Sequence, residues 1–145
     1  MKAKDLMCGD WLLINGTPHK IQAIDSIDAE IQADEELYYV GEDRYHSEDK
    51  IEGITITPEI LEKNGFYAIN TQWYCKRFWS NGCFDIAISL VNREIEVSRV
   101  CGAGTDCEEV EYRSPIAFGN DICIHSLQQA LRICGLKELA DNFKV

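Results

Sequence analysis

Seven cysteines and three histidines are the residues of this chain best suited to bind a metal or to act as a catalytic nucleophile and base. A structural zinc site needs several such ligands at short, regular spacings. No two cysteines form a C-x-x-C pair; the gaps run from Cys75 to Cys83, from Cys101 to Cys107 and from Cys123 to Cys134. His125 follows Cys123 by two residues, and we interpret it as a helix-entry residue whose ring packs or caps. We therefore predict no metal site.

Nucleophilic catalysis and nucleotide binding are also disfavoured. A catalytic thiolate needs a base beside it, and a chain with this many cysteines places some near a histidine by chance. The "CGAGTDC" segment (101–107) contains Gly102 and Gly104, but it lacks the third glycine and helix of a dinucleotide site and the Lys-Ser/Thr of a P-loop. The cysteine count is odd and no apolar leader opens the chain, so we expect reduced thiols in a cytoplasmic protein. We predict no cofactor and favour a non-enzymatic role.

The segment from Trp73 to Trp79 is the strongest candidate for a binding surface. Aromatic side chains alternate there with two bases, an arrangement that stacks a base or holds a protein partner. The candidate residues are Trp73, Tyr74, Lys76, Arg77, Phe78 and Trp79. The alternative is a strand of the sheet core with its two basic side chains at the rim.

A second candidate surface is acidic. The net charge is −11, and residues 25–52 contribute most of it, with eleven acids and two bases. Exposed carboxylates there would mimic phosphates and block a nucleic-acid-binding protein; the candidates are Asp34, Glu35, Glu36, Glu42 and Asp43. The overall field disfavours direct binding to nucleic acid or to an anionic membrane and favours a basic protein partner. The longest apolar run is far too short for a membrane span.

The strands that would carry these residues are predicted from alternation. Phe84, Ile86, Ile88 and Leu90 alternate with small or polar residues, which is the period of a half-buried strand. We expect antiparallel strands over 73–79, 84–91 and 94–100, and a last strand over 110–113 that ends at Ser114-Pro115. Ile54 to Ile56 predicts a further short strand.

The N-terminal region predicts a hairpin. Asn15-Gly16 separates an apolar strand over 11–14 from a return strand over 19–25, and both turn residues tolerate positive φ. Alternation over 27–34 predicts a third strand, with a helix over 27–39 as the alternative, and a short strand is expected at 37–40. The segment "GDWLLINGTPHKIQAI" (9–24) resembles the start of a small SH3-like barrel, which implies a β-barrel subdomain over about residues 1–50.

Two short helices are predicted from their capping residues. Thr57, Pro58 and Gly65 delimit the first, with Phe66 folding back onto Leu61. In the second, Ser126 and Gln129 form an S-x-x-Q capping pattern, and Gly135 ends the helix. Its apolar stripe comprises Leu127, Ala130, Leu131 and Cys134.

Two of these segments together resemble a known group of proteins. "ITITPEILEKNGF" (54–66) and "ICIHSLQQALRICGL" (122–136) are similar to segments of small uncharacterised proteins of Bacteroidetes genomes and prophages. The resemblance implies a fold and a phage or mobile-element origin, but no established activity. Ser126 stands where those proteins tend to have glutamate, so no role of a His-Glu pair carries over.

The sequence therefore predicts a single α+β domain of 145 residues, divisible near residue 50. We expect a mainly antiparallel sheet with SH3-like N-terminal strands and two short helices packed on it. The leading functional hypothesis is a cytoplasmic, non-enzymatic binding or adaptor module with a protein partner; a homo-oligomer is compatible with it. The alternatives are the acidic nucleic-acid mimic and a small-ligand protein or enzyme with an aromatic pocket.

Overall fold

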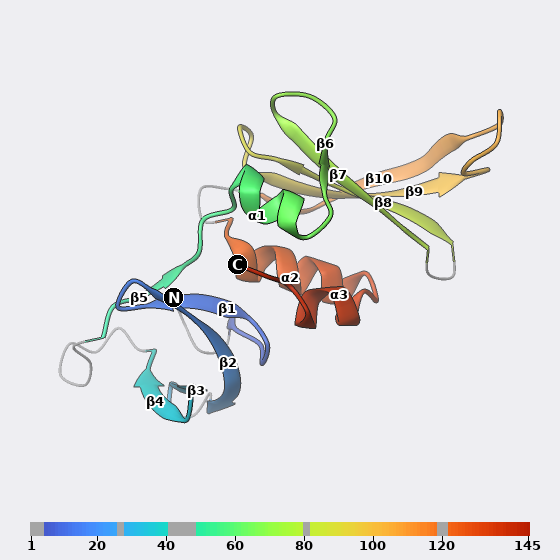
Figure 1. Cartoon of the computed structure of the whole chain (residues 1–145). Helices are drawn as coiled ribbons and strands as arrows, with labels where there is room; N and C mark the ends of the chain where they lie inside the picture. The colour runs from blue at the N-terminus through green and yellow to red at the C-terminus, as the bar shows by residue number, and fades with distance from the viewer. Residues whose placement is uncertain (1–4, 26–27, 41–48, 80–81, 119–121) are drawn as a thin grey trace.

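The computed structural model describes residues 5–25, 28–40, 49–79, 82–118 and 122–145. Within these ranges the chain forms two five-stranded antiparallel sheets and three short helices, an α+β architecture (Figure 1). The first sheet comprises β1 (Trp11–Ile14), β2 (Thr17–Asp25), β3 (Glu30–Ala33), β4 (Glu36–Tyr39) and β5 (Ile51–Gly53). The second comprises β6 (Tyr67–Ala68), β7 (Trp73–Trp79), β8 (Cys83–Ser89), β9 (Glu94–Cys101) and β10 (Glu109–Phe118). The helices are α1 (Pro58–Lys63), α2 (Ile124–Ile133) and α3 (Lys137–Asp141).

The first sheet has the order β4-β3-β2-β1-β5, so the last strand returns to pair with the first. The predicted Asn15-Gly16 turn is confirmed: both residues have positive φ, and Ile14 pairs with Thr17. The expected strand at 54–56 is wrong. The pairing with β1 is made by Ile51–Gly53, while Thr55 makes an isolated bridge to Cys123. The chain is therefore already leaving the first sheet at Ile54.

The second sheet has the order β10-β9-β8-β7-β6, a meander of neighbouring strands. The predicted strands between Trp73 and Val100 are confirmed. The predicted break at Ser114-Pro115 is wrong, because β10 continues to Phe118 with a register shift between Pro115 and Ala117. Proline is tolerated there because β10 is an edge strand, where no neighbour needs its missing N–H.

Helix α1 has the predicted ends. The Thr57 side chain accepts a hydrogen bond from the Ile60 amide at 3.4 Å, and Phe66 N–H donates to the Leu61 carbonyl at 3.0 Å beyond a left-handed Gly65. Leu61 and Phe66 both lie in the main core. These contacts form the glycine-terminated helix end that the sequence predicts.

Helix α2 ends as predicted but begins earlier. Its N-cap is Cys123, and the Ser126 capping pattern is wrong. The bridge between Thr55 and Cys123 and the bond from Ile124 N–H to the Ile54 carbonyl, at 2.8 Å, start the helix at Ile124. At the other end Gly135 has positive φ and Leu136 N–H donates to Leu131, as expected.

A buried polar network joins the first sheet to the helices that lie between the two sheets (Figure 1). Asp10 is fully buried; it pairs with Arg132 and accepts a hydrogen bond from Gln129 at 2.9 Å. Gln128, also fully buried, accepts from the Trp11 amide at 2.9 Å and donates to the carbonyls of Gly9 and Ala140 at 2.8 Å. Gln129 is therefore part of this joint and not of a helix cap.

The apolar side chains gather in two clusters. One lies within the first sheet and comprises Leu6, Leu12, Ile14, Ile21, Ile31, Ala33 and Val40. The larger one lies between the second sheet and the helices; it includes Ile86, Ile88 and Ile95 from the strands and Leu127 and Leu131 from α2. None of the helices in the described ranges is long and apolar enough to cross a membrane.

Candidate functional site

The predicted binding strand, β7, divides its side chains between two environments. Tyr74 and Phe78 face the main core, and Tyr74 is a buried member of it. Lys76 lies on the same side: its ammonium donates to the Asn64 carbonyl at 2.6 Å and sits over the rings of Phe66 and Phe78. Burial lowers the pKa of Lys76. These three predicted binding residues therefore do not share a surface with the other three.

Trp73, Arg77 and Trp79 lie on the opposite side of the sheet, which no described helix covers (Figure 1). We call this side the open face. Cross-strand partners share a face, and the register places Tyr67, Cys75, Ala87 and Glu96 in one row and Arg77, Asp85, Ser98 and Arg113 in the next. Several large apolar side chains on or beside these rows have high exposed fractions: Trp79 at 69%, Ile69 at 57%, Tyr67 at 55% and Val110 at 47%.

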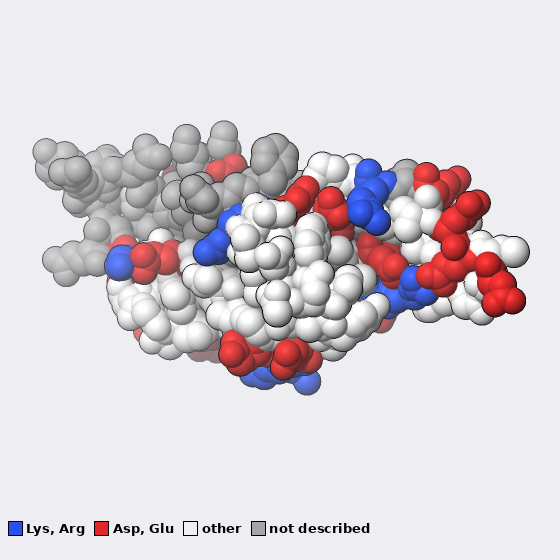
Figure 2. All heavy atoms as spheres, turned by 90° about the horizontal axis from the view of Figure 1, so that it is seen from above, with Lys and Arg blue, Asp and Glu red and all other residues white. Residues whose placement is uncertain are grey.

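The open face carries charges of both signs. Its two rows include Arg77, Asp85, Glu96 and Arg113. Figure 2 shows the molecule from above, with acidic side chains gathered toward one end and basic side chains among them. Glu108 lies in the connection between β9 and β10 and holds it to the sheet through Arg77.

Arg77 is fully engaged within the chain. Its guanidinium donates twice to Asp85, at 2.8 Å each, and twice to Glu108, at 2.8 and 3.0 Å. These bonds raise its pKa. Glu108 also accepts the Gly104 amide at 2.9 Å. Arg77 thus fastens the 102–108 connection onto the sheet, and the two basic residues of β7 are both occupied by intramolecular contacts.

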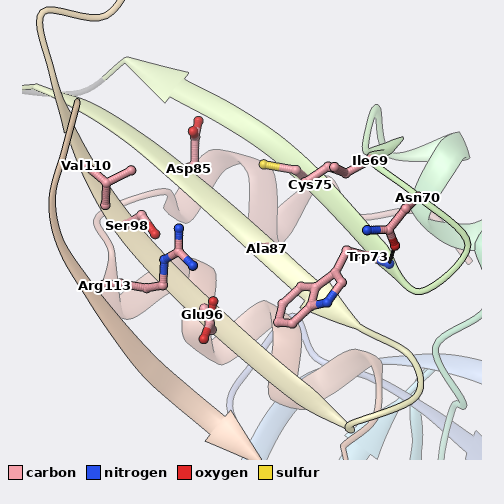
Figure 3. A pocket seen from close by; sticks show the side chains of 10 residues that line it. All are labelled: Ile69, Asn70, Trp73, Cys75, Asp85, Ala87, Glu96, Ser98, Val110 and Arg113. Atoms are coloured by element: carbon pink, nitrogen blue, oxygen red, sulfur yellow. Dashed lines mark hydrogen bonds between the residues drawn. The ribbon is translucent and has the colours of Figure 1, made fainter. Parts of the chain in front are cut away.

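A hollow of about 270 Å³ lies in the open face (Figure 3). Its lining comes from β7 to β10 and the β6–β7 connection: Ile69, Asn70, Trp73, Cys75, Asp85, Ala87, Glu96, Ser98, Val110 and Arg113. The side-chain oxygen Oδ1 of Asn70 accepts hydrogen bonds from the backbone amides of Gln72 and Trp73 at 2.8 and 3.0 Å, and these bonds fix the backbone that carries the Trp73 ring. Of the hollow's lining, the sequence had indicated only Trp73, because the other residues come together through strand register.

The acidic candidates lie on the first sheet or outside the described residues. Asp34, Glu35 and Glu36 form the exposed β3–β4 turn, and both Asp34 and Glu35 have positive φ. Asp34 contacts the His19 ring nitrogen at 2.7 Å, and Glu36 accepts from Tyr38 at 2.8 Å. Glu42 and Asp43 lie outside the described residues. Two of the three described carboxylates therefore already have partners within the chain.

The Cys123 and His125 side chains meet at the start of α2. The Cys123 sulfur lies 2.9 Å from His125 Nδ1 and 3.4 Å from the Ser126 hydroxyl. Burial raises the pKa of the Cys123 thiol and lowers the pKa of His125. Both shifts favour the neutral thiol and the neutral imidazole over the thiolate that a cysteine nucleophile needs.

The remaining candidates for chemistry are the other cysteines, possible metal ligands and a second groove. All seven cysteines lie in the described ranges and are free thiols. In the described part of the chain, no group of three metal-ligating side chains could hold an ion. A second, more open groove of about 500 Å³ lies at the joint; Lys20, Arg132 and Asp141 line it, but Arg132 is bound to Asp10 and Asp141.

A comparison of the chain with protein-family models, with curated proteins and with solved structures found no match.

Proposed function

We propose that the chain is a cytoplasmic, non-enzymatic binding or adaptor module and that the open face binds a basic protein partner. The observation that carries this proposal is the uncovered side of the second sheet, where Trp79, Ile69, Tyr67 and Val110 remain exposed. Large exposed apolar side chains on one face are found at interaction sites, and tryptophan is enriched among the residues that dominate binding energy.

Charge supports a basic partner over other occupants. The chain carries a net charge of −11, and acidic side chains gather toward one end of the molecule seen from above (Figure 2). This field speeds association with basic proteins and repels nucleic acid. A second copy of the chain would bring the same negative charge and is therefore a weaker candidate.

The non-enzymatic role rests on the sequence, in which we find no catalytic or cofactor motif. The phage or mobile-element origin rests on the resemblance of segments 54–66 and 122–136 to Bacteroidetes prophage proteins. An SH3-like subdomain at the N-terminus is also part of the proposal, and the return of β5 to β1 supports it.

The experiment is partner capture with matched variants. Wild-type protein, the W73S/W79S variant and the L37S control are immobilised and exposed to a Bacteroidetes lysate; Leu37 is an exposed apolar residue of β4, on the other sheet. We expect a protein with a basic segment that the wild type and L37S retain, that W73S/W79S loses, and that elutes with rising salt. Equal retention by all three proteins, or no retention at all, would contradict the proposal.

A further inference from the structure

We propose that the hollow in the open face receives one cationic side chain of the partner, arginine or lysine, with Trp73 and Glu96 as its recognition residues. This inference rests on the proposed function and deepens it, because it states which chemical group of the partner the open face selects.

The hollow exists because small residues occupy neighbouring positions on three strands. Cys75, Ala87 and Ser98 line it from β7, β8 and β9; Cys75 pairs directly with Ala87, and Ser98 lies one row further along. Larger neighbours, including Trp73, Ile69 and Val110, stand around them. A side chain that enters between these neighbours rests on the sheet backbone and its small side chains.

The volume suits a single side chain. Pockets for drug-sized molecules measure roughly 300–1,000 Å³, and this hollow measures about 270 Å³. Its lining side chains also lie on the side of the sheet opposite the helices (Figure 3). Both features favour an anchor that belongs to a larger partner over a free small molecule.

The groups around the hollow favour a positive charge. Asp85 and Glu96 line it, and Arg113 is the only base that does so. Arg77 lies next to Asp85, but Asp85 and Glu108 already neutralise it. Glu96 therefore offers a carboxylate beside the Trp73 ring (Figure 3). An aromatic face and a carboxylate in one recess are the two groups that attract a guanidinium or an ammonium.

Arg113 is a base of the chain itself, and its charge would repel a cation that enters the hollow. It lies on the edge strand β10, opposite Ser98 and diagonal to Glu96, and its residue is exposed. Among the described residues it makes no ion pair. If the hollow selects a cation, removal of Arg113 removes a repelling charge and strengthens binding. If the hollow selects an anion, the same substitution weakens binding.

The test is a nuclear magnetic resonance titration of the full chain. The probes are N-acetyl-arginine amide, its neutral isostere N-acetyl-citrulline amide, and N-acetyl-glutamate amide. The readout is the indole N–H resonance of Trp73, with Trp11 as the internal control, because the Trp11 indole is bonded to the Phe143 carbonyl at the joint. The proteins are the wild type, E96Q, R113Q and A87L, and an unchanged dispersed spectrum shows that each variant is folded.

We expect the arginine probe to shift the Trp73 resonance and the other two probes to leave it in place. E96Q should lower the affinity for the arginine probe about tenfold, and R113Q should raise that affinity several-fold. A87L should abolish the shift of the Trp73 resonance by filling the hollow. Equal shifts by the arginine and citrulline probes would overturn the inference. So would a shift by the glutamate probe that R113Q removes.

The inference and the proposed function can fail separately. If W73S/W79S loses the captured partner while E96Q, R113Q and A87L bind it as the wild type does, the open face is the binding surface but the hollow does not select a cation. If no partner depends on the open face, the proposed function fails whatever the probes do.

Discussion

The two sheets have the same number of strands and both are antiparallel, but they differ in how their faces are covered. The first sheet brings β5 back to β1 and encloses an apolar cluster of its own. The second sheet packs one side against α1 and α2 and leaves the other side without a second layer (Figure 1). Exposed aromatic area accumulates on that uncovered side. This difference is the reason that we propose the second sheet, and not the acidic turn of the first, as the contact surface.

The largest effect is expected where the two sheets are joined. Asp10→Ala leaves the Arg132 guanidinium without its fully buried partner. Breaking one side of a buried ion pair costs about 3–5 kcal/mol. We expect urea unfolding, followed by tryptophan fluorescence, to show a loss of this size in a single transition. Two separate transitions would mean that the sheets are independent and that the joint does not couple them.

The next prediction contrasts the two sides of the second sheet. Ile88→Ala removes a buried side chain from the core side and should cost about 2–5 kcal/mol. Trp79→Ser removes a mostly exposed side chain from the open face and should change stability by no more than about 0.5 kcal/mol. Thermal unfolding of both variants measures the difference. A large loss in W79S would show that this side is covered after all.

These sides illustrate what the sequence could predict. Alternation through Phe84, Ile86 and Ile88 correctly separated the strand into two faces, because side-chain direction follows from strand geometry alone. What covers each face depends on the path of distant segments. The sequence therefore could not show that Tyr74 packs in the core while Trp73 lies on the open face. Nor could it show that Glu96 and Arg113 line the same hollow.

The errors in element boundaries have the same origin. Ser126 and Gln129 match a capping pattern, but Gln129 instead donates to Asp10, more than a hundred residues away in the chain. Pro115 predicted a strand end, and only the position of β10 at the sheet edge makes it tolerable. Local patterns identified the elements, and long-range contacts decided their ends.

A smaller effect is expected from pH at the start of α2. Burial lowers the pKa of His125 from its ordinary 6.5, against the opposing effect of Asp10 and Asp5. Below pH 6.5, His125 therefore binds a proton in the unfolded chain while it is still neutral in the folded chain. The free energy of unfolding consequently falls as the pH decreases toward the folded-state pKa. Urea unfolding of the wild type and H125N, from neutral to mildly acidic pH, should show that H125N loses less stability. Parallel curves would contradict the burial of a neutral imidazole.

The smallest effect is expected at the acidic turn of the first sheet. Glu35→Lys reverses an exposed charge at the β3–β4 turn, and it should change stability by no more than about 0.5 kcal/mol. If the open face binds the partner, this substitution leaves affinity nearly unchanged apart from a small long-range effect that salt removes. A large loss of affinity in E35K would favour the acidic mimic of nucleic acid instead.

The affinity of the purified partner for wild type, W79S and L37S tests the open face most directly. Isothermal titration calorimetry at one salt concentration gives the three dissociation constants. Loss of a tryptophan that dominates an interface typically costs about 2 kcal/mol or more, so we predict that W79S raises Kd at least about thirtyfold. L37S, on the first sheet, should match the wild type. Equal constants for all three proteins, or a loss confined to L37S, would contradict the assignment of the contact surface to the second sheet.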